Sequence, residues 1–257
     1  MAKQANPNWW KSFYDDTPFY LYLERNDPAE LEATLYFLTR VLQVSPGDRL
    51  FDQCCGMGSV SIPLAQRGYR VVGVDLCEGF IKRAGRDIAG GDLSAEFHVG
   101  DAFEFVPEGS CDGAFNWYTS FGYSARDSEN IRMLQRAFES LKPGAWFALD
   151  FLNAPMIRNN FQASMVRKLQ TPEGEIVITR ECEIDEDTDI MKQVWHWQLP
   201  DGRKIESPST LRLYMPGQLV RLFERAGFTN VKLYGNLEGD PRSDFSPRCI
   251  CVGRRPG

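Results

Sequence analysis

Short apolar segments alternate with amphipathic helical segments along most of the chain. The segments between the apolar runs carry hydrophobic residues at helical spacing, as residues 31–42 do. This alternation predicts an α/β fold with a mostly parallel sheet that helices cover on both faces. Strands of the sheet are expected at residues 49–52, 69–75, 95–101, 113–118, 145–152, 230–235 and 247–253.

Capping residues mark the ends of two helices. Asp27 precedes Pro28, and proline suits the first helical position because its φ is already helical and its missing N–H leaves no donor unsatisfied. Pro216 is expected to begin the last helix, and this helix is expected to end at Ala226-Gly227-Phe228.

The pattern changes in the second half of the chain. Residues 175–185, 190–199 and 206–215 alternate between apolar and polar positions, which predicts an antiparallel meander rather than another strand–helix–strand unit. We therefore expect three parts: an N-terminal aromatic lid at 1–26, a core at 27–165 and 216–257, and an inserted antiparallel β lid at 166–215.

Composition and charge exclude several classes. Of the 257 residues 43% are hydrophobic and 25% charged, with a net charge of −6, so no broad basic surface for nucleic acid is expected. No run of 18 apolar residues predicts a membrane span. MAKQANPNWWKSF lacks the apolar core of a signal peptide, so we expect a cytoplasmic protein. The sequence leaves a homo-oligomer open.

The cysteines do not predict a metal site or disulfides. The chain has seven cysteines and two histidines, but no Cys-x-x-Cys pair. We expect no metal, and we expect Cys54 and Cys55 to be neutral packing residues.

Acidic residues end three successive strands. Asp52, Asp75 and Asp101 each follow an apolar run, and ligands of open α/β sheets bind beyond this edge. A nucleoside triphosphate site needs a lysine after Gly58, which is absent. A dinucleotide site needs glycine or alanine where Ser61 stands, and Asp52 would lie beside the pyrophosphate anion. S-adenosylmethionine fits better, since it has no phosphate and carries amino and hydroxyl donors.

The segment FDQCCGMGSVSIPLAQRGYRVVGVDLCEGFIKRA, with D-x-x-C-G-x-G at its first loop, resembles the core of class I S-adenosylmethionine-dependent methyltransferases. The resemblance extends through HVGDAFEF, NWYTSFGYSARDSENIRMLQRAFESLKPGAWFALDF and the late RAGF pattern. It implies a Rossmann-like fold, S-adenosylmethionine as cofactor and S-adenosylhomocysteine as product. It also implies cofactor contacts at Asp52, Cys54, Gly56 and Gly58 (methionine portion), Asp75 and Leu76 (ribose and adenine), Asp101 and Ala102 (adenine), Asn116 and Trp117 (reacting centre), and Tyr22.

The aromatic N-terminal segment suggests a lid. WWKSFYDD and YLYL are similar to the segment whose tyrosines close over cofactor and acceptor in small-molecule methyltransferases. We expect Tyr14 and Tyr22 to act in catalysis, with Phe121 as the opposite wall. Tyr20 and Tyr123 are weaker candidates for substrate contact. Packing of the aromatic residues on the sheet is the alternative interpretation.

The acceptor is expected to be a small organic molecule, with Trp195 and His196 of the insertion as further substrate contacts. An amine needs no strong general base, and the shortage of histidines together with Asn116 in place of an acid favours N-methylation. The chain is also similar to N-methyltransferases of antibiotics such as lincosamides. The alternatives are O-methylation with His196 as base, a cofactor-binding protein without methyl transfer, and a nicotinamide-dependent oxidoreductase.

Overall fold

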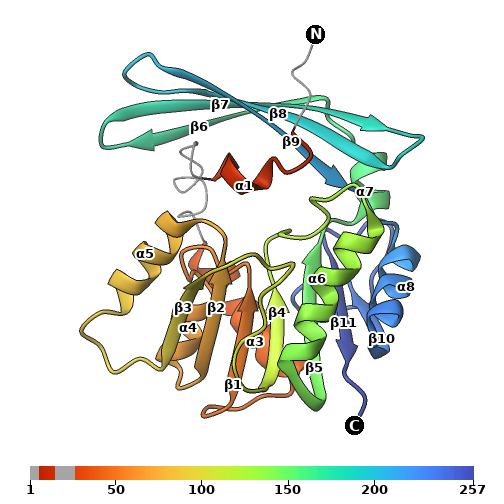
Figure 1. Ribbon diagram of the computed structural model, residues 1–257. Coiled ribbons are helices and arrows are strands. Elements are labelled where there is room, and N and C mark those ends of the chain that lie inside the picture. Colours follow the sequence, from red (N-terminus) through yellow and green to blue (C-terminus); the bar gives the residue numbers. More distant parts are fainter. Residues whose placement is uncertain (1–5, 15–26) are drawn as a thin grey trace.

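Seven strands form the larger sheet, sheet A, of the computed structural model, which describes residues 6–14 and 27–257 (Figure 1). The neighbouring pairs among β1 to β5 are parallel, and β11 runs antiparallel to both β5 and β10. The prediction of a seven-stranded, mostly parallel, Rossmann-like sheet is confirmed. Across the sheet the order is β10 (Thr229–Tyr234), β11 (Cys249–Arg254), β5 (Leu141–Phe151), β4 (Cys111–Asn116), β1 (Arg49–Gln53), β2 (Arg70–Asp75) and β3 (Ala95–Val99).

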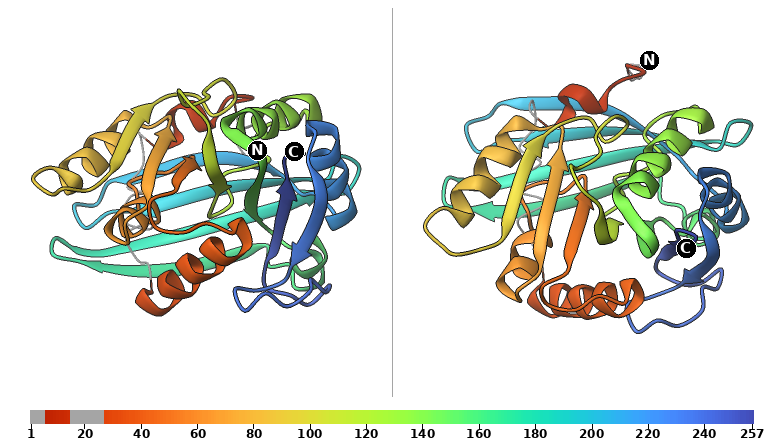
Figure 2. Two further views of the ribbon diagram at one scale, coloured as in Figure 1. Left: turned by 90° about the horizontal axis from the view of Figure 1, so that it is seen from below. Right: turned by 60° about the horizontal axis from the view of Figure 1, so that its bottom comes forward.

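Helices cover sheet A on both faces. Buried side chains of α6 (Asp127–Ser140) and α8 (Pro216–Ala226) pack in one hydrophobic cluster, and those of α3 (Pro28–Leu42) and α4 (Ser61–Gln66) pack in another. Figure 2 shows α3 and α6 on opposite sides of the sheet. The remaining described helices are α1 (Trp10–Phe13), α5 (Glu78–Ile88) and α7 (Ala154–Asn159).

Asp27 and Pro28 lie at the start of α3, and Gly227 lies at the end of α8. The Asp27 carboxylate accepts a hydrogen bond of 2.9 Å from the Ala29 N–H, and Pro28 is the first residue of α3. Gly227 ends α8 with φ +106°, a backbone conformation that glycine adopts without a Cβ clash.

A second, antiparallel sheet, sheet B, contains β6 (Ser164–Thr171), β7 (Gly174–Asp185), β8 (Ile190–Gln198) and β9 (Lys204–Arg212) in that order. It lies across the carboxyl ends of β1, β2 and β4, and α1 lies between the two sheets (Figure 1). The predicted meander is confirmed, but β6 was not predicted. The division of the chain into lid and core segments stays a prediction.

Tyr20 and Tyr22 lie outside the described residues. None of the described helices is long and apolar enough to cross a membrane. The cytoplasmic location stays a prediction.

Candidate active site

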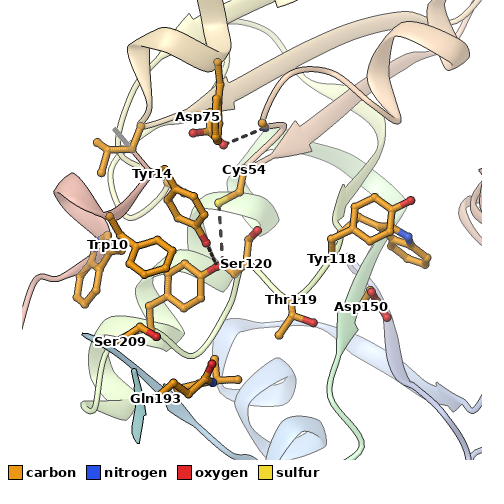
Figure 3. Close-up of a pocket in the computed structure, with 18 of the residues that line it drawn as sticks. Trp10, Tyr14, Cys54, Asp75, Tyr118, Thr119, Ser120, Asp150, Gln193 and Ser209 are labelled. Atoms are coloured by element: carbon orange, nitrogen blue, oxygen red, sulfur yellow. Dashed lines mark hydrogen bonds between the residues drawn. The ribbon is translucent and has the colours of Figure 1, made fainter. Parts of the chain in front are cut away.

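A cavity of about 670 Å³ lies between the carboxyl edge of sheet A, α1 and the inner face of sheet B. This volume is in the range of pockets that enclose small organic ligands, about 300–1,000 Å³. Figure 3 shows Asp75 and Cys54 on one side of the cavity and Gln193 and Ser209 on the other. Tyr14 lies between them. The cavity therefore has one wall from sheet A and one from sheet B.

Asp75, at the end of β2, holds the sheet A wall together. One carboxylate oxygen accepts from the Gly56 N–H and the other from the Cys77 N–H, both at 2.9 Å. These bonds tie the loop after β1 to the loop after β2. The carboxylate also lines the cavity.

Asp101 provides a second carboxylate at the same edge. Its Oδ1 accepts from the Phe103 N–H at 3.0 Å, and its Oδ2 lies 3.9 Å from Lys11 Nζ. Leu76 and Ala102, the residues that follow the two acids, line the cavity as well. The structure thus brings together the residues predicted for the ribose and adenine.

Asp52 lies behind this wall and is not among the residues that line the cavity. It is 3% exposed, and Ser61 Oγ donates to its carboxylate at 2.6 Å. Burial raises the pKa of Asp52 to about 7, with a further increase from the charge of Asp75 and a decrease from the Ser61 hydrogen bond. The carboxyl group therefore anchors the start of α4. The sequence had instead suggested that it contacts the methionine portion of the cofactor.

Two other predicted cofactor residues also lie outside the cavity lining. Gly58 has φ +79°, and a Cβ there would approach Ile62 at 3.0 Å. Asn116 is fully buried, and its amide donates to Gln53 Oε1 at 3.3 Å. Both positions shape the loop after β1 from behind rather than facing the cavity.

The paired cysteines are neutral. Burial, followed by the nearby charge of Asp75, raises the pKa of the Cys54 thiol well above its usual range. Burial and the charge of Asp52 do the same for the pKa of Cys55. Among residues 6–14 and 27–257, no group of three His, Cys, Asp or Glu side chains is placed to hold a metal ion.

An aromatic cluster closes the cavity beside α1. The Tyr14 and Tyr123 hydroxyls are 2.7 Å apart, and the Tyr123 ring packs against Trp9 with ring centroids 4.7 Å apart. Burial raises the pKa of Tyr14 and of Tyr123, so both stay neutral hydroxyls. Tyr123, a weak candidate from the sequence, is thus a direct partner of Tyr14.

The segment after β4 reverses direction at the cavity. Tyr118 and Thr119 have φ of +60° and +62°, and both line the cavity with Trp117. Phe121, predicted as a cavity wall, instead lies in the hydrophobic core, with its ring 5.8 Å from that of Tyr214. The reversal carries Phe121 past the edge of the sheet and into the core.

Residues of β8 alternate between the two faces of sheet B. Trp195, which the sequence suggested as a substrate contact, lines the cavity and stacks with Trp197 at a ring distance of 6.2 Å. His196 points to the opposite face, where its Nε2 lies 3.5 Å from Glu181 and its Nδ1 3.9 Å from Glu206. The structure therefore does not bring His196 to the cavity.

Sequence reasoning missed an ionic group at the far end of the cavity. Asp150, at the end of β5, accepts from Arg248 at 2.8 Å, and Arg248 also pairs with Glu30. Burial raises the pKa of Asp150, while Arg248 opposes that effect. These residues are far apart in sequence, and only the position of Asp150 at a strand end gave a signal.

The residues at the sheet A wall fit S-adenosylmethionine. Asp75 and Asp101 offer acceptors for ribose hydroxyls and for an adenine amino group. A Cβ built on Gly56 would meet no atom within 4 Å, so the backbone there faces open space beside the cavity. The ring of Phe80, 6.0 Å from that of Tyr14, adds an apolar surface for a base or a sulfonium.

Comparisons with known proteins agree with this site. Residues 50–144 match a family described as "Methyltransferase domain". The CcbJ methyltransferase from Streptomyces caelestis has the same fold, with a TM-score of 0.77 and 19% identity, covering 96% of this chain and 99% of that chain. The sugar N-methyltransferase KedS8 from Streptoalloteichus sp. has a TM-score of 0.75 and 20% identity, covering 95% and 93%.

Relatives found by sequence match a smaller part of the chain. The S-adenosyl-L-methionine-dependent Diels-Alderase iccD of Talaromyces variabilis is 32% identical over 114 residues, which are 42% of this chain. The chain spans only 37% of the length of that relative and 16% of a 23S rRNA uracil methyltransferase of Azoarcus sp.. The resemblance stated from the sequence is confirmed. The predicted cofactor agrees with these matches, because iccD is named as dependent on S-adenosylmethionine.

Proposed function

We propose that this chain, whose residues 50–144 belong to the methyltransferase domain family, transfers the methyl group of S-adenosylmethionine to an amine nitrogen of a small organic acceptor. The observation that carries the proposal is the two-walled cavity. The carboxylates of Asp75 and Asp101 line it on one side, and the hydrogen-bonded pair of Tyr14 and Tyr123 closes it beside α1.

The two walls have different tasks in this proposal. S-adenosylmethionine, when bound, supplies an electrophilic methyl group on a sulfonium. Asp75 and Asp101 bind the nucleoside portion, because their carboxylates accept hydrogen bonds from hydroxyl and amino groups. Sheet B closes the cavity above and excludes water.

The tyrosine pair orients the acceptor. Both hydroxyls are neutral, because burial raises the pKa of each. A neutral hydroxyl oxygen accepts a hydrogen bond from an amine N–H, which turns the nitrogen lone pair toward the methyl group. The aromatic faces around the site attract positive charge without offering a nucleophile that could be methylated.

The preference for nitrogen over oxygen rests on the lack of a suitable base. Phenols and alcohols react faster when a general base removes their proton, and histidine is the usual choice near neutral pH. No histidine is among the described residues that line the cavity, and His196 lies on the outer face of sheet B. An amine attacks once it is neutral, so it needs no such residue.

Three observations support a secondary metabolite as acceptor. KedS8, a sugar N-methyltransferase, shares the fold over nearly the whole chain. Sheet B also covers one side of the cavity, so a small molecule fits it better than a nucleotide within a folded RNA. The net charge of −6 points the same way.

Cofactor binding without methyl transfer is the second candidate. The relative from Talaromyces variabilis is named for a Diels–Alder reaction although it depends on S-adenosylmethionine. A cavity with neutral hydroxyls and aromatic walls also suits a reaction in which the cofactor only positions or polarises the substrate.

One assay separates these candidates. The protein is incubated with methyl-labelled S-adenosylmethionine and panels of amino sugars, amino acids, phenols and transfer RNA, and products are identified by mass spectrometry. We expect label in an amine. Label only in phenols or RNA would reject the amine proposal, and tight binding of S-adenosylhomocysteine without any labelled product would favour the second candidate.

A further inference from the structure

The inner face of sheet B carries a small set of polar side chains directed to the cavity. Arg180 of β7, Gln193 of β8 and Ser209 of β9 line it, and Arg167 and Lys168 of β6 line it as well. Figure 3 shows Gln193 and Ser209 on the wall opposite Asp75. The other inward residues of these strands are mostly large apolar groups, such as Trp195.

The side-chain amide of Gln193 faces the cavity. Its side chain is only 8% exposed, yet its amide forms no hydrogen bond with the described residues. The amide lines the cavity, so a bound ligand is the group that would satisfy it.

The guanidinium of Arg180 forms no ion pair with a carboxylate of the described residues. Its guanidinium lies over the Trp195 ring, 5.3 Å from the centroid, and donates to Met165 Sδ at 2.9 Å. No carboxylate of the described residues lies within 4.0 Å of it. By contrast, Arg248 pairs with Asp150 at the far end of the cavity.

The register of sheet B brings these groups within reach of one ligand. Arg180 is paired with Trp195, and Gln193 is paired with Ser209. Gln193 is therefore the diagonal neighbour of Arg180 on the same face, and such neighbours are about 7–8 Å apart. Long side chains at that separation can hold a single small group between them.

We propose that the methyl acceptor carries a carboxylate, which the Arg180 guanidinium and the Gln193 amide bind on the sheet B wall. A guanidinium presents two parallel N–H groups that match the two oxygens of a carboxylate, and stacking on Trp195 fixes its orientation. Gln193 adds a neutral N–H donor. This inference rests on the proposed function, because it assigns the remote end of the acceptor whose amine is methylated.

The test uses the full-length protein loaded with S-adenosylhomocysteine. Calorimetry measures binding of α- and ω-amino acids, each compared with its own methyl ester. At least one acid should bind about tenfold or more tightly than its ester, as expected for a hydrogen bond to a charged group. The inference is overturned if every acid binds no better than its ester, or if no acid binds.

Five variants locate the effect. Arg180→Gln and Gln193→Glu should each weaken binding of the acid about tenfold or more, while leaving binding of S-adenosylhomocysteine unchanged. Lys192→Gln and Gln198→Leu are matched controls, because both residues are exposed on β8. They should leave binding of the acid unchanged. Thermal unfolding checks that each variant is folded, and Gln193→Leu, expected to lose only a few-fold, provides a second folded variant.

The remaining outcomes separate this inference from the proposed function. If Arg180→Gln weakens binding of S-adenosylhomocysteine and leaves binding of the acid unchanged, the guanidinium contacts the cofactor and the inference is wrong. If methyl transfer occurs only to uncharged amines, the inference fails while the proposed function stands. If Arg180→Gln abolishes acid binding but no compound is ever methylated, the carboxylate site stands and the proposed function fails.

Discussion

Replacing Asp52 by asparagine should stabilise the protein at alkaline pH. Burial raises the pKa of Asp52 from its ordinary value of 3.8 to about 7. Below 3.8 both folded and unfolded states hold the proton. As the pH rises from 3.8 to 7 the unfolded state loses it first, so the folded state becomes progressively less stable. Above 7 this loss is complete and amounts to about 4 kcal/mol, at about 1.36 kcal/mol for each pKa unit.

Asparagine has nearly the same shape as the protonated acid but never ionises, and Ser61 can still donate to its side-chain oxygen. The free energy of unfolding of Asp52→Asn relative to wild type should therefore increase by about 3 kcal/mol between pH 5 and pH 8. Urea denaturation of both proteins at the two pH values measures this. Other titrating groups are common to both proteins and cancel in the difference.

A difference between the two proteins that does not change with pH would refute the reasoning. The same variant tests the position of Asp52 behind the cavity wall. Binding of S-adenosylhomocysteine, measured by calorimetry, should change less than about threefold in Asp52→Asn. In Asp75→Asn, which alters a carboxylate that lines the cavity, it should fall about 10- to 100-fold, because hydrogen bonds to charged groups contribute about 1.5–3 kcal/mol. An equal loss in both variants would place Asp52 at the ligand.

Two further predictions concern the aromatic cluster and the glycine loop. Tyr14→Phe removes one hydroxyl of the 2.7 Å pair with Tyr123, so kcat should fall about three- to tenfold with unchanged binding of S-adenosylhomocysteine; unchanged kcat would exclude a direct role of the hydroxyl. Gly58→Ala should lower the free energy of unfolding by about 1–3 kcal/mol more than Gly47→Ala, measured by urea denaturation. Both glycines have positive φ, but only at Gly58 would a Cβ approach side chains at 3.0 Å, and equal effects would contradict this.

Much of the fold could be predicted from local patterns. Helix α3 begins at Pro28 and α8 ends at Gly227, because proline and glycine fix the backbone where they stand. The seven strands of sheet A were recognisable as apolar runs. Strand β6 was missed because Arg167 and Lys168 interrupt its apolar residues, and as an edge strand it is held mainly by pairing with β7.

The candidate site was only partly predictable. Acids that follow strands β2 and β3 could be placed at the cavity, since the carboxyl ends of parallel strands meet at one edge. Asp52 occupies the same kind of position, yet the start of α4 at Ser61 covers it. His196 and Gln193 differ in parity along β8, so the alternation of this strand could have assigned them to opposite faces. Which face meets the cavity depends on how sheet B packs over sheet A, and local sequence does not encode that.

Three residues beside the cavity have backbone conformations that their residue types disfavour, so the sequence does not predict them. Cys54 follows β1, and Tyr118 and Thr119 follow β4, its neighbour in the sheet. All three line the cavity with positive φ, +68°, +60° and +62° respectively, although none is glycine. Such residues are strained by on the order of 1 kcal/mol or more each, and Thr119 is β-branched, which makes the conformation less favourable still. Two adjacent strands therefore end in backbone that local preferences disfavour, at the edge where a ligand is expected to bind. Packing of the surrounding residues maintains this strain. The backbone geometry of the wall is therefore determined by tertiary contacts and could not be predicted from the local preferences of Cys54, Tyr118 and Thr119.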